Sequence, residues 1–345
     1  MSFVTGLSLP NSVNKDVQPI DLVDDFIQGV YKSQSAKKLD DILMDYHLTT
    51  NKKLRAKICL DVAKNLGIRS KDVLGWACGC EIFNNAYRVS EISLQKILNS
   101  DFNSTAEDLK SIYESQIATS SFLALIPLSL GQIPINDGIK NRLLITVMDF
   151  SLKVHEAQLG LLNLDYRGSS VNRSANLPGR LISEYQEIVS RKAQALFEMP
   201  VYGTALIVGL SDKEAKRISE SFRDLGILVQ MVEDIIAFYG NKEDMESSLS
   251  FLNLLLVSYV STFPNLSDSI FQKVQKILNG ESDREELAKE FLEKQILRDV
   301  LTIVRSQIMN IEKSESLKPW PKIVELVKIY SQNLTRPIDH LLRNY

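Results

Sequence analysis

The sequence predicts an all-α protein, a single large bundle of about a dozen helices. Only 15 Gly and 10 Pro occur in 345 residues, so there are few tight turns to join many short strands. Apolar residues recur at the three- and four-residue spacing of a helix face along most of the chain. No segment shows the alternation of a strand, and no repeat of fixed period occurs.

The first half of the chain divides into a short lead and a series of helices. Residues 1–19 form a flexible polar lead, and residues 20–345 form one domain. We expect helices at about 20–31, 39–47, 53–66, 72–98, 104–130 and 137–165. Gly67 stands at the C′ position of the third helix, and Ser70 has the character of an N-cap for the fourth.

The second half continues the helical pattern after the clearest internal loop, residues 167–178. Helices are expected at about 180–198, 200–209 and 212–240, and Pro200 separates the first two because proline restricts the residue before it. Residues 245–343 predict four more helices, with breaks near Pro264, Gly280 and residues 314–321.

Composition excludes several function classes. With 40 Lys and Arg against 43 Asp and Glu, the net charge of −3 argues against non-specific nucleic-acid binding, which needs a basic surface. No segment reaches the roughly 18 apolar residues of a membrane span, and the N-terminus lacks the pattern of a secretory signal. The three cysteines, Cys59, Cys78 and Cys80, form no disulfide framework and indicate reduced thiols in the cytoplasm.

Five segments from residue 46 to about residue 245 carry motifs in a fixed order. They are Tyr46–Ala56 (YHLTTNKKLRA), Glu81–Ile92 (EIFNNAYRVSEI), Ala157–Leu162 (AQLGLL), Lys192–Ala193 and Gly226–Gly240 (GILVQMVEDIIAFYG). In type, order and spacing they resemble the motifs of the polyprenyl synthetases, the trans-isoprenyl diphosphate synthases. The resemblance implies the isoprenoid-synthase fold.

The resemblance also implies a site for diphosphates. Enzymes of this family join allylic and homoallylic diphosphates, and two Asp-rich helices hold the Mg²⁺ ions that neutralise the leaving group. A basic pocket binds the second diphosphate. The positions that match the family's diphosphate-binding residues are Lys52, Arg55, Lys192 and Gln230.

The first Asp-rich motif is degenerate. At 91–95 the chain has Glu-Ile-Ser-Leu-Gln, so Glu91 is the one carboxylate left as a metal ligand. A lone carboxylate holds Mg²⁺ poorly because this ion gives up its water reluctantly. Arg88, one turn earlier, is placed to pair with Glu91 and neutralise it. The arginine pair expected in the loop that follows is missing from residues 96–102.

The second motif is half retained. Glu233 and Asp234 occupy its first two acidic positions as metal ligands, whereas Ala237 replaces the third. Apolar neighbours predict that this helix is largely buried. A buried carboxylate pair needs cations or hydrogen-bond donors, since like charges cannot both ionise cheaply there.

Tyr87 and Arg88 are the candidate cavity residues. Tyr87 lies four residues before the first motif, where the resemblance implies a bulky aromatic that closes a short apolar shaft. The alternative is a tyrosine that simply packs in the core.

Two functions from different classes follow from these departures. One is a non-catalytic or regulatory subunit that forms a heteromer with an active prenyl diphosphate synthase, or a homodimer, with a prenyl diphosphate as a possible ligand and no cofactor. The other is an active terpene synthase or prenyltransferase that acts on an allylic prenyl diphosphate with Mg²⁺ and non-standard metal ligands. An isoprenoid-binding protein without chemistry is a third reading.

Overall fold

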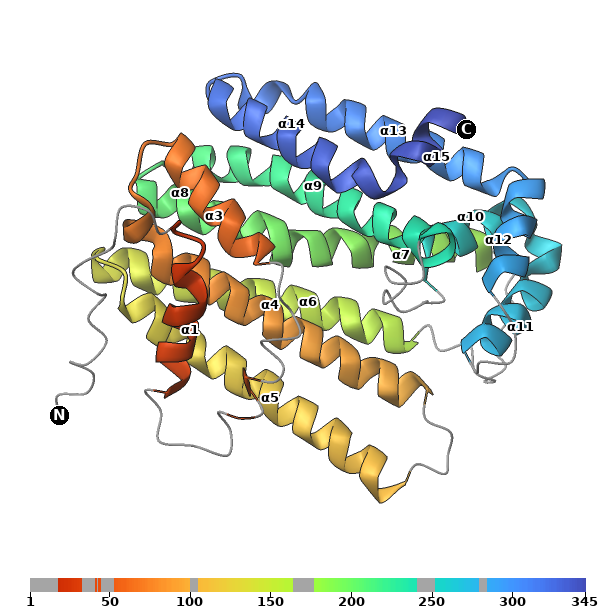
Figure 1. The fold of residues 1–345 in the computed structure, drawn as a ribbon, viewed down its shortest axis with the longest axis horizontal. Helices are drawn as coiled ribbons and strands as arrows, with labels where there is room; N and C mark the ends of the chain where they lie inside the picture. The colour runs from red at the N-terminus through yellow and green to blue at the C-terminus, as the bar shows by residue number, and fades with distance from the viewer. Residues whose placement is uncertain are drawn as a thin grey trace. The chain divides into compact units, whose positions relative to one another are not determined.

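A computed structural model describes residues 18–32, 41, 43–44, 53–99, 105–163, 177–240, 252–278 and 284–345 (Figure 1). These residues form helices and no strand, so the predicted all-α class is confirmed. The chain divides into two compact units. Unit 1 contains Met1–Val154 and Ala195–Ser219, and unit 2 contains His155–Gln194 and Glu220–Tyr345. Most of the predicted polar lead and of the predicted helix at 39–47 lies outside the described residues.

Unit 1 is built around one long central helix. Its helices are α1 (Leu22–Lys32), α3 (Leu54–Asn65), α4 (Ser70–Asn99), α5 (Ala106–Gly131), most of α6 (Asp137–Asn163), α8 (Met199–Val208) and the start of α9 (Asp212–Tyr239). Helix α4 packs against α1, α3, α5 and α8. It therefore contributes to most of the core of this unit.

A tryptophan joins α4 to α8 in that core. Trp76 is fully buried, and its Nε1 donates a hydrogen bond of 2.8 Å to the carbonyl oxygen of Pro200. Gly203, one turn further along α8, lies so close that a Cβ atom there would stand 2.1 Å from Cζ2 of the indole. Only a residue without a side chain allows this approach.

Unit 2 contains the end of α6 and most of the C-terminal helices. These are α7 (Leu177–Ala193), the rest of α9, α10 (Leu254–Thr262), α11 (Ser267–Leu278), α12 (Arg284–Glu293), α13 (Ile296–Glu312), α14 (Pro321–Thr335) and α15 (Asp339–Asn344). Helix α10 packs against α7 and α13, and α13 packs against α12 and α14. No described helix has the length and apolar character to cross a membrane.

One predicted helix boundary is confirmed, and two others differ from the prediction. Gly67 has φ of +85°, the left-handed conformation expected at C′. Helix α4 begins at Ser70, two residues earlier than predicted. Pro200 does not interrupt the helical backbone. A π-helix over Gln194–Glu198 joins α7 to α8, and the proline lies in the first turn of α8, where it is tolerated.

The prediction of four helices over 245–343 was wrong, because the described part of this region contains more and shorter helices. Gln295, with φ of +63°, separates α12 from α13. Glutamine rarely adopts this left-handed conformation, so the residue type at 295 does not predict a helix boundary there. The expected break near Pro264 is present.

Replacing Gly203 tests the contact between α4 and α8. Gly203→Ala forces the Trp76 ring to move, and we expect a loss of about 1–3 kcal/mol in the free energy of unfolding, measured by urea denaturation. The matched control is Gly131→Ala, since no atom lies within 4 Å of a Cβ there. Equal midpoints for the two variants would contradict the packing described.

Candidate functional site

The predicted site residues lie in both units. Arg55 lies on α3 and Tyr87, Arg88 and Glu91 on α4, all in unit 1. Lys192 lies on α7, and Gln230, Glu233 and Asp234 lie on α9, all in unit 2. Lys52 lies outside the described residues.

Asp234 is the best-defined of these groups. Its side chain is buried, with 5% exposure, and its carboxylate accepts three hydrogen bonds. Oδ2 accepts from the Tyr185 hydroxyl at 2.8 Å and from the backbone N–H of Leu254 at 2.9 Å. Oδ1 accepts from Nε2 of Gln230 at 2.9 Å. The carboxylate therefore joins α7, α9 and the first turn of α10.

Asn253 strengthens the same junction. Its Oδ1 accepts from the backbone N–H of Leu255 at 2.9 Å and so caps α10. Its Nδ2 donates to the carbonyl oxygen of Asp234 at 3.0 Å. We call these residues the Asp234 cluster: Tyr185, Gln230, Asp234, Asn253 and Leu254.

Burial dominates the electrostatics of the cluster. Loss of water raises the pKa of Asp234 to about 6, although the hydrogen bonds from Tyr185, Gln230 and Leu254 act to lower it. Burial, together with the negative charge of Asp234, raises the pKa of the Tyr185 hydroxyl well above its usual value. Tyr185 is therefore a hydrogen-bond donor to Asp234 over the physiological pH range.

The two acidic side chains of the second motif lie in different environments. Glu233 is exposed, whereas Asp234 is buried. Ala237, at the third position of the motif, is also buried and offers no ligand atom.

The Asp234 cluster does not fit a Mg²⁺ ion. This ion requires octahedral oxygen ligands, and it is held by carboxylate oxygens that face it. Here Oδ2 already accepts two hydrogen bonds and Oδ1 accepts one. Within the described ranges, no three His, Cys, Asp or Glu side chains gather so as to hold a metal. We therefore derive no chemical step through a metal at this position.

In unit 1, Glu91 is in contact with Tyr87. Glu91 is half-buried, and its Oε1 accepts a hydrogen bond from the Tyr87 hydroxyl. The Tyr87 side chain is buried, with 6% exposure, and Arg88 is exposed. The pairing of Arg88 with Glu91 that the sequence suggested stays a prediction. The hydrogen bond to Glu91 described here comes from Tyr87, one turn earlier on the same helix.

A buried glutamate holds the basic segment at the start of α3, which we define as residues 53–55. Glu81 on α4, with 3% exposure, accepts a hydrogen bond of 2.9 Å from the backbone N–H of Ala56. Lys53, just before α3, has φ of +40° and forms an ion pair with Asp24. The Arg55 guanidinium lies 4.9 Å from the ring centroid of Phe197.

Glu81 belongs to a segment that carried the resemblance, but sequence reasoning gave it no role. Its contact with Ala56 joins positions 25 residues apart, which no helical spacing reveals.

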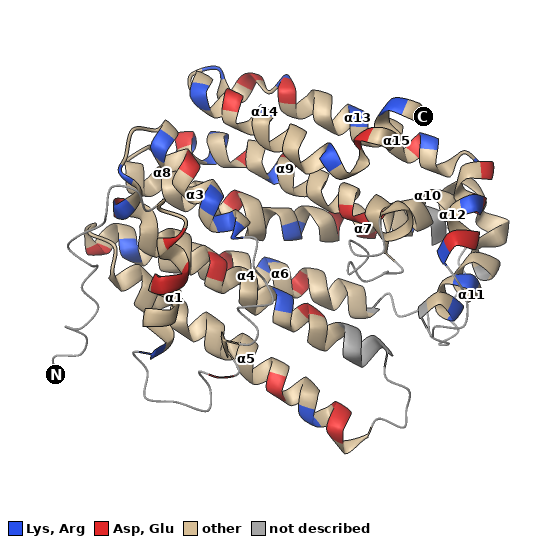
Figure 2. Ribbon diagram, viewed as in Figure 1, with Lys and Arg blue, Asp and Glu red and all other residues tan. Residues whose placement is uncertain are grey.

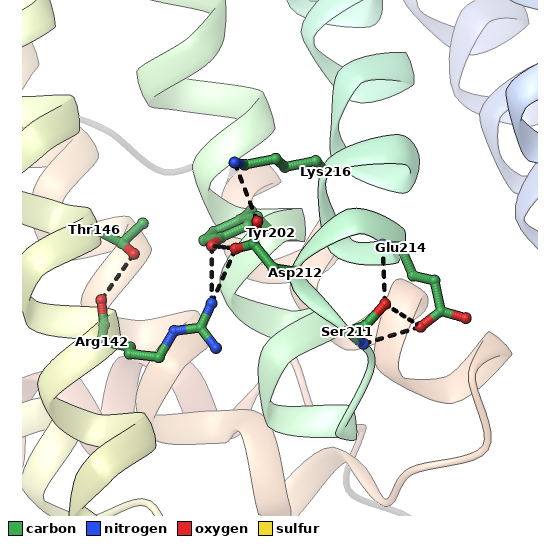
Figure 3. Close-up of polar contacts among 7 residues, drawn as sticks. All are labelled: Arg142, Thr146, Tyr202, Ser211, Asp212, Glu214 and Lys216. Carbon is green, nitrogen blue, oxygen red and sulfur yellow. Dashed lines mark hydrogen bonds and ion pairs between the residues drawn. The ribbon is translucent and has the colours of Figure 1, made fainter.

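A second polar cluster in unit 1 was not predicted (Figure 3). Asp212, at the start of α9, accepts from the Tyr202 hydroxyl at 2.6 Å and forms ion pairs with Arg142 at 3.0 Å and Lys216 at 3.1 Å. Hydrogen bonds from Tyr202 and then Lys216 lower the pKa of Asp212. These exposed groups satisfy one another, so the cluster joins α6, α8 and α9 at the surface and offers no reactive group.

Comparisons with known proteins agree with the fold. Residues 104–252 match the family model described as polyprenyl synthetase. This segment contains Lys192 and the second motif, but it begins after the first motif. No curated protein sequence matches the chain significantly.

Solved structures match nearly the whole chain. A geranylgeranyl pyrophosphate synthase has 15% identity over 93% of this chain and 99% of its own, with a TM-score of 0.73. The geranylgeranyl pyrophosphate synthetase from Pyrococcus horikoshii Ot3 has 17% identity over 91% of this chain and 94% of its own, with a TM-score of 0.68. A decaprenyl diphosphate synthase from Rhodobacter capsulatus has 15% identity, coverages of 92% and 95%, and a TM-score of 0.69. At these identities the likeness shows the fold.

Removing the Asp234 carboxylate should destabilise the protein strongly. Asp234→Ala leaves three buried donors without an acceptor, and we expect a loss of about 3 kcal/mol or more in the free energy of unfolding. Glu233→Ala, at the exposed neighbour, should change it by less than about 0.5 kcal/mol. Similar urea midpoints for the two variants would show that the cluster does not hold unit 2 together.

The raised pKa of Asp234 also gives a pH dependence with a defined sign. Because the folded-state pKa of about 6 lies above the ordinary aspartate pKa of 3.8, the folded state binds the proton more tightly than the unfolded chain does. The stability of the wild type relative to Asp234→Asn should fall as pH rises from about 4 to about 6, by at most about 1.4 kcal/mol per pH unit, and then level off. Urea unfolding of both proteins at several pH values measures this difference. A difference that rises with pH over the same window would contradict the assignment.

Proposed function

We propose that this chain, which belongs to the polyprenyl synthetase family, is a non-catalytic or regulatory subunit that associates with an active prenyl diphosphate synthase. The observation that carries the proposal is the Asp234 cluster. The carboxylate that the family motif would assign to Mg²⁺ instead accepts hydrogen bonds from Tyr185, Gln230 and Leu254. The described residues thus offer no cluster of acidic side chains to hold the Mg²⁺ ions that would neutralise a leaving diphosphate.

The state of the first motif supports the same proposal. Glu91 is the only acidic residue in 91–95, and it accepts a hydrogen bond from Tyr87. The arginines of the following loop are missing from 96–102. Three separate parts of the family's machinery are thus altered together, which favours loss of catalysis over a change of a single ligand.

A residual ligand site is part of the proposal. Lys52 and Arg55, which match diphosphate-binding positions of the family, would supply positive charge to a bound prenyl diphosphate. Lys192 matches a further such position and belongs to unit 2. The free and buried cysteines Cys59, Cys78 and Cys80 agree with a protein that works in the reducing cytoplasm.

The alternative is an active prenyltransferase or terpene synthase with unusual metal ligands. The exposed carboxylate of Glu233 is the observation that favours it, since that side chain remains accessible to a cation. In that case Mg²⁺ would be required, and Glu233, not Asp234, would be the acidic ligand on α9.

A product assay separates the two functions. The purified chain is incubated with Mg²⁺ and geranyl, farnesyl or geranylgeranyl diphosphate, each with and without isopentenyl diphosphate, and products are identified by mass spectrometry. We expect no product from well-folded protein. A known active synthase under identical conditions is the positive control, and circular dichroism confirms the helical fold. A longer prenyl diphosphate or a cyclised hydrocarbon would overturn the subunit proposal, and Glu233→Gln would then test the alternative.

A further inference from the structure

The backbone around Arg55 is fixed on both sides. Before it, Lys53 adopts the left-handed conformation with φ of +40°, and its ammonium forms an ion pair with Asp24 on α1. After it, the backbone N–H of Ala56 donates a hydrogen bond of 2.9 Å to the buried carboxylate of Glu81. These contacts determine where the side chain of Arg55 begins. They do not determine where its guanidinium lies, because the bonds of such a long side chain can still rotate.

A buried aromatic ring determines the position of the guanidinium. Cζ of Arg55 lies 4.9 Å from the ring centroid of Phe197, which is within the range of a cation–π interaction. The Phe197 side chain is 3% exposed, whereas Arg55 is half-buried. The ring thus belongs to the core of unit 1, and the guanidinium lies at the margin of that core. A cation–π interaction strengthens as water is removed from it, so this contact can hold the charged group in place.

Phe197 is placed by an unusual piece of backbone. It lies in the π-helix Gln194–Glu198, immediately before α8. Each hydrogen bond of a π-helix spans one residue more than that of an α-helix, so a π-turn changes the direction of the side chains around it. Such turns are rare and occur often at functional sites. The direction of the Phe197 ring is therefore a consequence of this turn.

The backbone that follows the π-helix is anchored to two other helices of unit 1. The carbonyl oxygen of Pro200 accepts a hydrogen bond of 2.8 Å from Nε1 of Trp76 on α4. It also accepts one of 3.6 Å from Sγ of Cys59 on α3. Helices α3 and α8 pack against each other. The ring and the arginine are thus carried by elements that are packed together, so the guanidinium is held before any ligand binds.

A guanidinium held over a ring suits an anion of the phosphate type. The group is planar, and its N–H donors point outward in that plane, where they match phosphate oxygens in pairs. Fixing this long side chain in advance lowers the entropy cost of binding. Basic residues also outnumber acidic ones on α3 (Figure 2). They are Arg55, Lys57 and Lys64, against Asp61.

We propose that Phe197 is a positioning residue for diphosphate binding. Its ring, directed by the π-helix, holds the Arg55 guanidinium in the orientation that receives the anion. The inference rests on the residual ligand site of the proposed function. It gives a role to a core residue that acts on the ligand only through Arg55, and to the π-helix that carries this residue.

Isothermal titration calorimetry with inorganic pyrophosphate, without Mg²⁺ and at constant ionic strength, tests this role. Phe197→Leu removes the ring and keeps an apolar side chain, and it should raise the dissociation constant about 3- to 10-fold. Phe197→Tyr keeps the ring, so its dissociation constant should stay within about 2-fold of that of the wild type. Circular dichroism checks the fold of each variant. If Phe197→Leu does not fold, Phe197→Met replaces it, because methionine adapts to irregular core spaces.

A double-variant cycle separates positioning from packing. In the Arg55→Gln background no guanidinium remains for the ring to hold, so adding Phe197→Leu should not raise the dissociation constant further. A ring that only fills the core would give the same fold-change in both backgrounds. The matched control is Phe150→Leu. It removes another cation–π contact, in which Nζ of Lys153 lies 4.4 Å from the ring centroid of Phe150, and it should bind pyrophosphate as the wild type does.

Four results would overturn the inference. They are equal affinity of the wild type and Phe197→Leu, equal losses in Phe197→Leu and either Phe197→Tyr or Phe150→Leu, an unchanged fold-change in the Arg55→Gln background, and a wild type that binds no pyrophosphate. None of these results creates a product, so each leaves the non-catalytic role to the product assay. A product in that assay would refute the proposed function and leave the coupling between Phe197 and Arg55 in place.

Discussion

The position of α10 on α7 and α9 depends on one buried carboxylate. Asp234 cannot be ionised at 5% exposure without donors around it, and it obtains them from a tyrosine hydroxyl, a glutamine amide and the N-terminal amide of α10. These contacts join residues 49 and 20 positions apart in the chain. Hydrogen-bond donors of the protein thus stabilise the charge of this carboxylate.

Unit 1 shows a related use of a buried acid. Glu81 accepts the backbone N–H of Ala56 and so fixes the start of α3, where Arg55 lies over Phe197. The positive end of the α3 dipole supplies the charge complement. The basic segment therefore has a defined position even though no acidic cluster for a metal accompanies it among the described residues.

Helices with a regular apolar face could be predicted well from the sequence, and those without such signals could not. Gly67 follows α3 in the left-handed conformation that its residue type indicates. The residue type of Gln295 does not indicate the left-handed conformation that separates α12 from α13. The sequence indicated that Asp234 would need cations or donors; it could not choose between them, because Tyr185 comes from another helix. Likewise the motif at 91–95 revealed a missing carboxylate, while the hydrogen bond from Tyr87 to Glu91 depends on side-chain conformations that periodicity does not determine.

The most direct test of the Asp234 cluster is a crystal structure grown with Mn²⁺ and inorganic pyrophosphate, with an anomalous difference map to locate the metal. We expect no anomalous peak within ligand distance of Asp234, and we expect its hydrogen bonds with Tyr185, Gln230 and Leu254 to be retained. A manganese ion bound to the Asp234 carboxylate, with those donors displaced, would contradict the central claim and return this residue to a catalytic role.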